Sequence, residues 1–239
     1  MKESPGDWMR GHLVDIERRN EAVLEEVVSL VHHAIANDGL VITTGTGHSL
    51  ALVLETFYRA GGLACVRPIY HPALLPLAGG LLSTRLERVE GLGKALVEAA
   101  GPSPSDVAFV FSNSGTNPVP VEMTMALREV GTTVVAVSSV TSMREAPSRA
   151  SHKLGDLADY LLDTDAPSGD AFIGTETMPT AAVSSLAGVY LWNLMLARLA
   201  EVAETNGTRL PLWLSANVEG GDERNQELVA RYRPRVPML

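Results

Sequence analysis

Residues 112–117, Ser-Asn-Ser-Gly-Thr-Asn, carry the polar side chains from which most can be inferred. Hydroxyls occur on alternate residues, at Ser112, Ser114 and Thr116, between an apolar run and Pro118. Proline suits the first position of a helix, so this segment should lead into a helix N-terminus, where backbone N–H groups favour an anion. The hydroxyls add neutral donors. We therefore expect a phosphate group to bind here; a turn that only caps a helix is the alternative.

A second polar loop, Gly-Thr-Gly-His-Ser, occurs at residues 45–49. It begins like a dinucleotide fingerprint, but Leu50 stands where the third glycine would be. Arg67 stands where an acidic residue would close the second strand, and the chain has no Gly-Lys-Ser/Thr sequence typical of a P-loop. We therefore expect no nucleotide and no other cofactor.

Both loops follow an expected strand and precede an expected helix. Short β-rich runs predict strands over 40–43, 63–66, 107–111, 133–138 and 157–162. Apolar periodicity predicts helices over 7–37, 50–60, 86–100, 118–130, 181–205 and 222–232. Residues 67–85 and 163–180 are expected to be loops. Alternating strands and helices predict a parallel sheet with helices on both faces, and ligands bind beyond the carboxyl ends of such strands.

The composition limits the class of protein and its partners. The chain has 239 residues, 46% of them hydrophobic, and a net charge of −9, which favours a folded domain and argues against a nucleic-acid partner. The single cysteine, Cys65, permits no internal disulfide and is expected to be buried. The polar N-terminus does not resemble a signal peptide, and the apolar stretch 181–196 is interrupted by polar residues. We expect a cytoplasmic protein with no membrane segment.

These motifs together resemble the sugar isomerase (SIS) domain family. The resemblance is closest to a branch whose members carry the label phosphosugar isomerase although their reaction has not been characterised. The resemblance spans most of residues 40–225. It rests on both polar loops, on Phe-Tyr-Arg-Ala-Gly-Gly at 57–62, on Arg-Pro-Ile-Tyr-His at 67–71 and on Ser-Ala-Asn-Val-Glu-Gly-Gly-Asp at 215–222. The family includes isomerases, lyases and sensors that catalyse no reaction.

The resemblance implies a ligand and the residues that hold it. The ligand would be a phosphorylated sugar or amino sugar, with its phosphate on Ser112, Ser114 and Thr116 and with Ser49 touching the sugar or the phosphate. The full set of residues expected to bind the phosphosugar is Gly45, Thr46, Gly47, Ser49, Ser112, Asn113, Ser114, Gly115, Thr116 and Asn117.

Glu55 is the leading candidate for a catalytic base. It follows Ser49 by six residues on the helix that begins at the first loop, which places it roughly 9 Å along the helix axis. That length is comparable with the distance from a sugar's terminal phosphate to its carbonyl end. The resemblance also implies a glutamate on this helix. The alternative is a solvated helix carboxylate.

Three further residues could act as acids or bases. His48 and His71 lie in expected loops, and either imidazole could protonate a sugar oxygen. Glu219, in an acidic glycine-containing turn, could be a second acid or base, or could simply complement the next helix N-terminus. Asp170 and Glu176 form a weaker pair of candidates. No spacing of His and Glu predicts a metal site.

The expected fold is an α/β three-layer α/β/α sandwich with a mostly parallel sheet of five strands. Residues 1–38 would form a helical extension that packs on the domain or on a partner subunit, and residues 39–239 would form the SIS domain. Sites in this family commonly form where subunits meet, so the resemblance implies a homodimer or a larger assembly.

The expected activity is aldose–ketose isomerisation of a phosphosugar, in which a carboxylate removes the proton alpha to the carbonyl. An etherase or lyase begins with the same step and stays open as an alternative. A phosphosugar sensor without catalysis is the third possibility; a fused DNA-binding module would favour it, and this sequence shows none.

Overall fold

The central sheet has five parallel strands, as predicted, and their order is β2-β1-β3-β4-β5. The computed structural model describes residues 4–175 and 177–239. The strands are β1 (Val41–Gly45), β2 (Val66–Ile69), β3 (Val107–Phe111), β4 (Thr133–Ser138) and β5 (Tyr160–Asp163). Every residue of β1 and β3 is buried, which explains their continuous apolar and Thr-rich runs. Gly45 pairs with Phe111, so the loops that follow β1 and β3 begin side by side.

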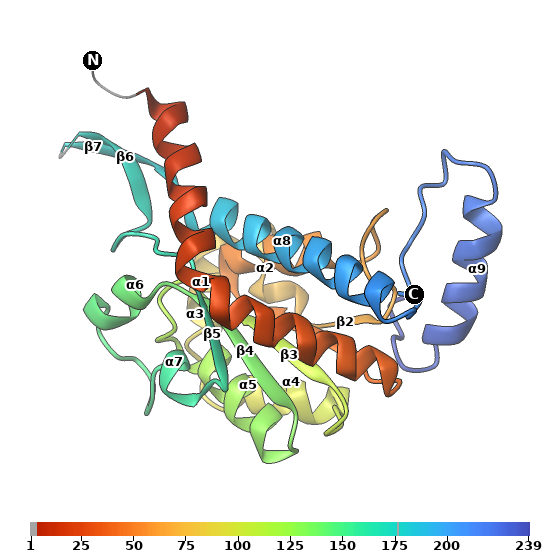
Figure 1. The fold of residues 1–239 in the computed structure, drawn as a ribbon. Helices are drawn as coiled ribbons and strands as arrows, with labels where there is room; N and C mark the ends of the chain where they lie inside the picture. The colour runs from red at the N-terminus through yellow and green to blue at the C-terminus, as the bar shows by residue number, and fades with distance from the viewer. Residues whose placement is uncertain (1–3, 176) are drawn as a thin grey trace.

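Helices cover both faces of this sheet, and α1 and α8 lie together on one face while α4 and α5 pack together on the other (Figure 1). The helices are α1 (Pro5–Ala36), α2 (Leu50–Thr56), α3 (Gly80–Leu86), α4 (Leu92–Ala100), α5 (Pro118–Glu129), α6 (Val140–Glu145), α7 (Leu154–Leu157), α8 (Ser184–Thr205) and α9 (Gly221–Tyr232). Short 3-10 turns occupy Gly47–Ser49, Pro72–Leu74 and Pro76–Ala78. The three-layer α/β/α class is therefore confirmed.

The long first helix begins at a capping box. Ser4 Oγ accepts a hydrogen bond from the Asp7 amide (3.1 Å), and the Asp7 carboxylate accepts one from the Ser4 amide (3.3 Å). Ile16, Leu24 and Val27 on its inner face are fully buried in the core that the sheet forms. The first helix thus packs on the rest of the chain, while the predicted division at residue 38 stays a prediction.

Some predicted boundaries differ from the observed ones. The strand expected at 63–66 is Val66–Ile69, because Pro68 lies on an edge strand of the sheet, where a missing N–H is tolerated. The helix expected over 50–60 ends at Thr56, and Tyr58 adopts a positive φ of 48°. The loop expected over 67–85 contains most of β2, two 3-10 turns and most of α3.

The predicted loop 163–180 contains an antiparallel hairpin. It consists of β6 (Ala171–Thr175) and β7 (Met178–Ala182), which form a separate two-stranded sheet and project from the body of the molecule (Figure 1). The exposed residues of β7 lack the apolar alternation by which a strand is recognised in sequence. Glu176, one of the weaker candidates, lies outside the described residues.

In the described part of the chain, α8 alone is long and apolar enough to cross a membrane, judged by length and composition. Core helices of globular proteins meet the same criterion. Leu191, Met195 and Leu199 of α8 are fully buried, and the helix packs against α1 and α2. It is a core helix in this fold, as the polar residues within its apolar stretch predicted.

Candidate ligand-binding site

A cleft of about 790 Å³ opens at the carboxyl ends of β1 and β3. Both predicted loops contribute to its wall, together with α3 and the segment before the hairpin. Its lining residues are Thr46, Gly47, His48, Ser49, Pro76, Gly80, Leu81, Ser83, Thr84, Glu87, Ser112, Asn113, Ser114, Asn117, Ser142, Ala146, Ser168, Gly169, Asp170 and Ser184.

The loop 112–117 presents donors to this cleft. Ser112 Oγ accepts a hydrogen bond from the Gly115 amide (3.3 Å), which leaves the serine O–H free to donate. Ser114 Oγ lies 3.3 Å from the buried Thr116 hydroxyl. Within residues 4–175 and 177–239, no hydrogen bond uses the backbone amides of Ser114, Thr116 or Asn117. The loop therefore offers both N–H and O–H donors to an anion.

Gly115 is required for the shape of this loop. Its φ of +58° is one that residues with a side chain rarely adopt, and a Cβ there would lie 2.7 Å from Met143 Sδ. Asn113 Oδ1 is buried and has no hydrogen-bond partner among the described residues.

The helix start beyond this loop donates less than the sequence predicted. Pro118 and Pro120 have no N–H, and the Val119 amide already donates to the Glu87 carbonyl (3.2 Å). The expectation of free N–H groups in the first turn of the helix was therefore wrong, and the amides on offer belong to the loop itself.

The first loop also lines the cleft. Gly45 approaches β3 so closely that a Cβ there would lie 2.9 Å from the Phe111 carbonyl oxygen. Gly47, His48 and Ser49 form a 3-10 turn and line the cleft. Gly45, Gly115 and Thr116 do not line the cleft; they shape or support the residues that do.

Sequence reasoning missed Glu87, which stands at the C-cap of α3. Its carboxylate lines the cleft, and Oε2 accepts a hydrogen bond from Thr46 Oγ1 (3.0 Å). A helix was expected to begin at residue 86, so Glu87 looked like one of many surface carboxylates. Only the folded chain brings it beside the 45–49 loop.

The second cleft carboxylate, Asp170, is already heavily engaged. It accepts hydrogen bonds from the amides of Val183 (3.1 Å) and Ser184 (2.8 Å) and from the Ser184 hydroxyl (2.6 Å). These donors are at the start of α8, so Asp170 caps that helix and fixes the base of the hairpin.

Three predicted catalytic residues lie outside the cleft lining, and their roles stay predictions. Glu55 forms an ion pair with Arg59 and accepts a hydrogen bond from Asn193 Nδ2 (3.5 Å). His71 Nδ1 accepts from the Ala73 amide (3.2 Å) and so caps a 3-10 turn. Glu219 is exposed in the turn before α9. His48 alone among the four lines the cleft.

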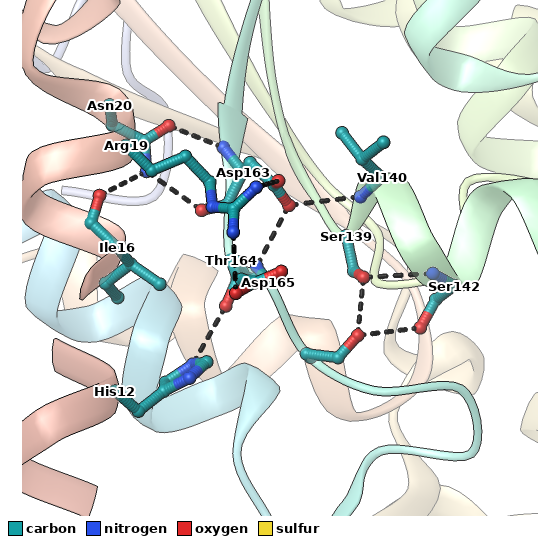
Figure 2. Close-up of polar contacts among 11 residues, drawn as sticks. His12, Ile16, Arg19, Asn20, Ser139, Val140, Ser142, Asp163, Thr164 and Asp165 are labelled. Carbon is teal, nitrogen blue, oxygen red and sulfur yellow. Dashed lines mark hydrogen bonds and ion pairs between the residues drawn. The ribbon is translucent and has the colours of Figure 1, made fainter.

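A polar network anchors the cleft wall to α1 (Figure 2). Asn20 donates to the carbonyls of Ile16 (2.7 Å) and Asp163 (2.9 Å) and accepts from the Asp163 amide (2.7 Å). His12 Nε2 donates to the Thr164 carbonyl (3.0 Å).

On the other side of the same segment, the hydroxyls of Ser139 (2.6 Å) and Ser142 (3.2 Å) donate to the Ala166 carbonyl (Figure 2). The chain from 163 to 167 is therefore held from both sides. It leads directly to Ser168, Gly169 and Asp170 at the cleft.

Neither a metal site nor a reactive thiol is found among the described residues. They hold no group of three or more His, Cys, Asp and Glu side chains suited to a metal ion. Cys65 is fully buried, and burial raises the pKa of its thiol to about 12, so it is no nucleophile near neutral pH.

Comparison with known proteins identifies the family. The family model described as "SIS domain" matches residues 7–139. A UPF0309 protein of Geobacillus kaustophilus is 35% identical over 234 residues, covering 95% of this chain and 92% of the relative. A UPF0309 protein of Brucella anthropi is 38% identical over 235 residues, covering 98% and 96%.

Solved structures agree on the fold. The phosphoheptose isomerase of Neisseria gonorrhoeae superposes with a TM-score of 0.57 over 81% of this chain and 93% of that chain, at 16% sequence identity. At that identity the likeness concerns the arrangement of helices and strands alone. Together, the family model and the full-length relatives show that the chain belongs to the SIS domain family and, within it, to the UPF0309 proteins.

Proposed function

We propose that the chain binds a phosphorylated sugar in the cleft and acts on it as an aldose–ketose isomerase. One observation carries the proposal: Ser112, Ser114 and Asn117, which hold the loop's hydroxyls and unused amides, line the same cleft as the Glu87 carboxylate. The loop suits a phosphate, and the carboxylate suits proton removal from the sugar.

In this proposal the phosphate lies on Ser112, Ser114 and the free loop amides. Charge-assisted hydrogen bonds from neutral donors to a phosphate oxygen are worth about 1.5–3 kcal/mol each. The sugar would then extend along the cleft toward Glu87 and His48.

Glu87 is the base that this geometry favours. Its carboxylate would take the proton from the carbon alpha to the carbonyl and return a proton to the neighbouring carbon. His48 would move the proton between the two oxygens. Thr46 would orient the carboxylate through its hydrogen bond to Oε2. Glu55, the base expected from sequence, stays as the competing assignment.

The test compares Glu87→Gln with Glu55→Gln. A thermal-shift screen against phosphorylated hexoses, amino sugars and their unphosphorylated parents first identifies a ligand. Exchange of the alpha proton with deuterated water, followed by NMR, then reports the first chemical step without knowledge of the product. We expect the wild type to exchange, Glu87→Gln to bind without exchanging, and Glu55→Gln to behave as the wild type.

Other outcomes have clear meanings. Loss of exchange in Glu55→Gln but not in Glu87→Gln would return the base to Glu55. Exchange accompanied by release of a substituent would make the protein a lyase. A wild type that binds a phosphosugar but exchanges nothing would be a sensor, and preference for no phosphorylated ligand would refute the proposal.

A further inference from the structure

The cleft has an unusual charge balance for a site that receives a phosphate. None of the described residues that line it is a lysine or an arginine, whereas two, Glu87 and Asp170, are carboxylates. The chain as a whole carries a net charge of −9. Neutral donors can hold a phosphate, but a dianion among carboxylates gains from a cation within a Debye length of about 8 Å.

The segment 146–154, which follows α6, runs against the predicted phosphate loop. The Arg149 amide donates to the Thr116 carbonyl (3.2 Å), and the Leu154 amide donates to the Gly115 carbonyl (2.8 Å). Lys153, the other cation of the segment, directs its ammonium to carbonyls at the end of α6, those of Met143, Arg144 and Ala146. Only Arg149 therefore turns its charge toward the loop.

The Arg149 guanidinium is bound to a residue of the cleft wall. Its Nη1 donates to Asn117 Oδ1 (3.2 Å), and Asn117 lines the cleft. Within the described ranges, no other lysine or arginine side chain has a hydrogen bond or ion pair with residues 112–117. Because Asn117 Oδ1 is occupied by Arg149, the two N–H donors of Nδ2 are left for the ligand.

We propose that Arg149 is the cation of this site: a positioning residue that orients the Asn117 amide toward the phosphate and supplies the positive charge that the cleft lining lacks. The ligand class is a phosphate monoester in its dianionic form. This inference rests on the proposed phosphosugar binding and adds a residue to it.

The test uses three variants of the full chain. Arg149→Gln removes the charge and retains an N–H donor for Asn117 Oδ1, Arg149→Lys keeps the charge, and Arg144→Gln is the control. The Arg144 side chain is exposed, and among the described residues its ion pair is with Glu145 (3.7 Å), not with the loop. The backbone bond from residue 149 to Thr116 survives every substitution, and thermal unfolding checks that each variant is folded.

Calorimetric titration measures binding of glucose 6-phosphate, fructose 6-phosphate, glucosamine 6-phosphate and inorganic phosphate at low and high sodium chloride. We expect Arg149→Gln to bind the phosphorylated ligands about tenfold more weakly at low salt and to lose most of the salt dependence. Arg149→Lys should recover most of the affinity, and Arg144→Gln should match the wild type.

A wild type that binds a phosphorylated sugar while Arg149→Gln binds it equally well, with the same salt dependence, would overturn the role of Arg149 and leave the proposed function standing. An equal loss in Arg149→Gln and Arg149→Lys, with unchanged salt dependence, would also overturn it. If the wild type binds none of these ligands, the proposed function fails and this inference fails with it.

Discussion

Ser112 and Ser114 use their hydroxyls differently, although both line the cleft. Ser112 Oγ accepts from the Gly115 amide and so helps to hold the loop closed. Among the described residues, the hydrogen-bond contact of Ser114 Oγ is with Thr116 Oγ1 alone. Replacing Ser112 therefore removes a ligand donor and a loop contact together, whereas replacing Ser114 removes chiefly a donor.

We expect the double variant Ser112→Ala/Ser114→Ala to weaken phosphosugar binding by several kcal/mol, because each lost bond to a charged acceptor costs about 1.5–3 kcal/mol. Titration calorimetry measures the change. Ser105→Ala is the control, since Ser105 is exposed and its hydroxyl bonds to Ser103 and to no other described residue. Unchanged affinity in the double variant would place the phosphate elsewhere.

The surroundings of Glu55 show where residue-scale reasoning from sequence reached its limit. Six residues along a helix advance it by about 9 Å but also turn it by about 600°, which puts Ser49 and Glu55 on different sides. Glu55 accordingly meets Asn193 of α8, not the cleft. The polar loops, in contrast, were predictable, because each directly follows a buried strand and parallel strands end at one edge.

Among the secondary-structure elements, α1 does more than cover the sheet. Asn20 on its buried face makes three hydrogen bonds to main-chain groups, two of them to Asp163 at the end of β5 (Figure 2). The sequence predicted this helix from its apolar stripe. The same pattern could not predict Asn20, because a polar residue on such a face acquires its partners only when β5 is in place.

We expect Asn20→Ala to lower the free energy of unfolding by about 2–4 kcal/mol, because the substitution leaves the buried amide and carbonyl of Asp163 without their partner. Urea denaturation followed by circular dichroism measures the change. Glu21→Gln is the matched control on the exposed side of the same helix. There the Glu21 carboxylate forms an ion pair with Arg198 at the surface. A decrease no larger than that of the control would show that the network adds no stability.

The hairpin was missed for a related reason. Its strands pair with each other rather than with the main sheet. Its base is fixed because Asp170, just before β6, accepts a hydrogen bond from the Ser184 amide at the start of α8. Such a long-range cap leaves no periodic signal in the sequence. Sequence patterns therefore predicted the elements that form around the core, and missed those set by single polar contacts.

At the scale of the whole molecule, large apolar side chains gather in exposed positions near the cleft. Leu77 is 97% exposed and Leu81 is 81% exposed, and Leu81 lines the cleft itself. Burial of a leucine side chain contributes about 1.5–3 kcal/mol, so these residues favour association at this end of the molecule.

We expect the intact chain to form a dimer or a larger assembly in which a second copy covers Leu77 and Leu81. Size-exclusion chromatography with light scattering should give at least twice the mass of the 25.5 kDa chain at micromolar concentration. The double variant Leu77→Asp/Leu81→Asp should run as a smaller species, since a charge buried in an apolar contact costs far more than one left in water.

The control variant is Val130→Asp, at the exposed C-terminal end of α5, which should keep the wild-type mass. A monomeric wild type would refute assembly altogether, whereas an unchanged mass in the double variant would place the subunit contact on another surface.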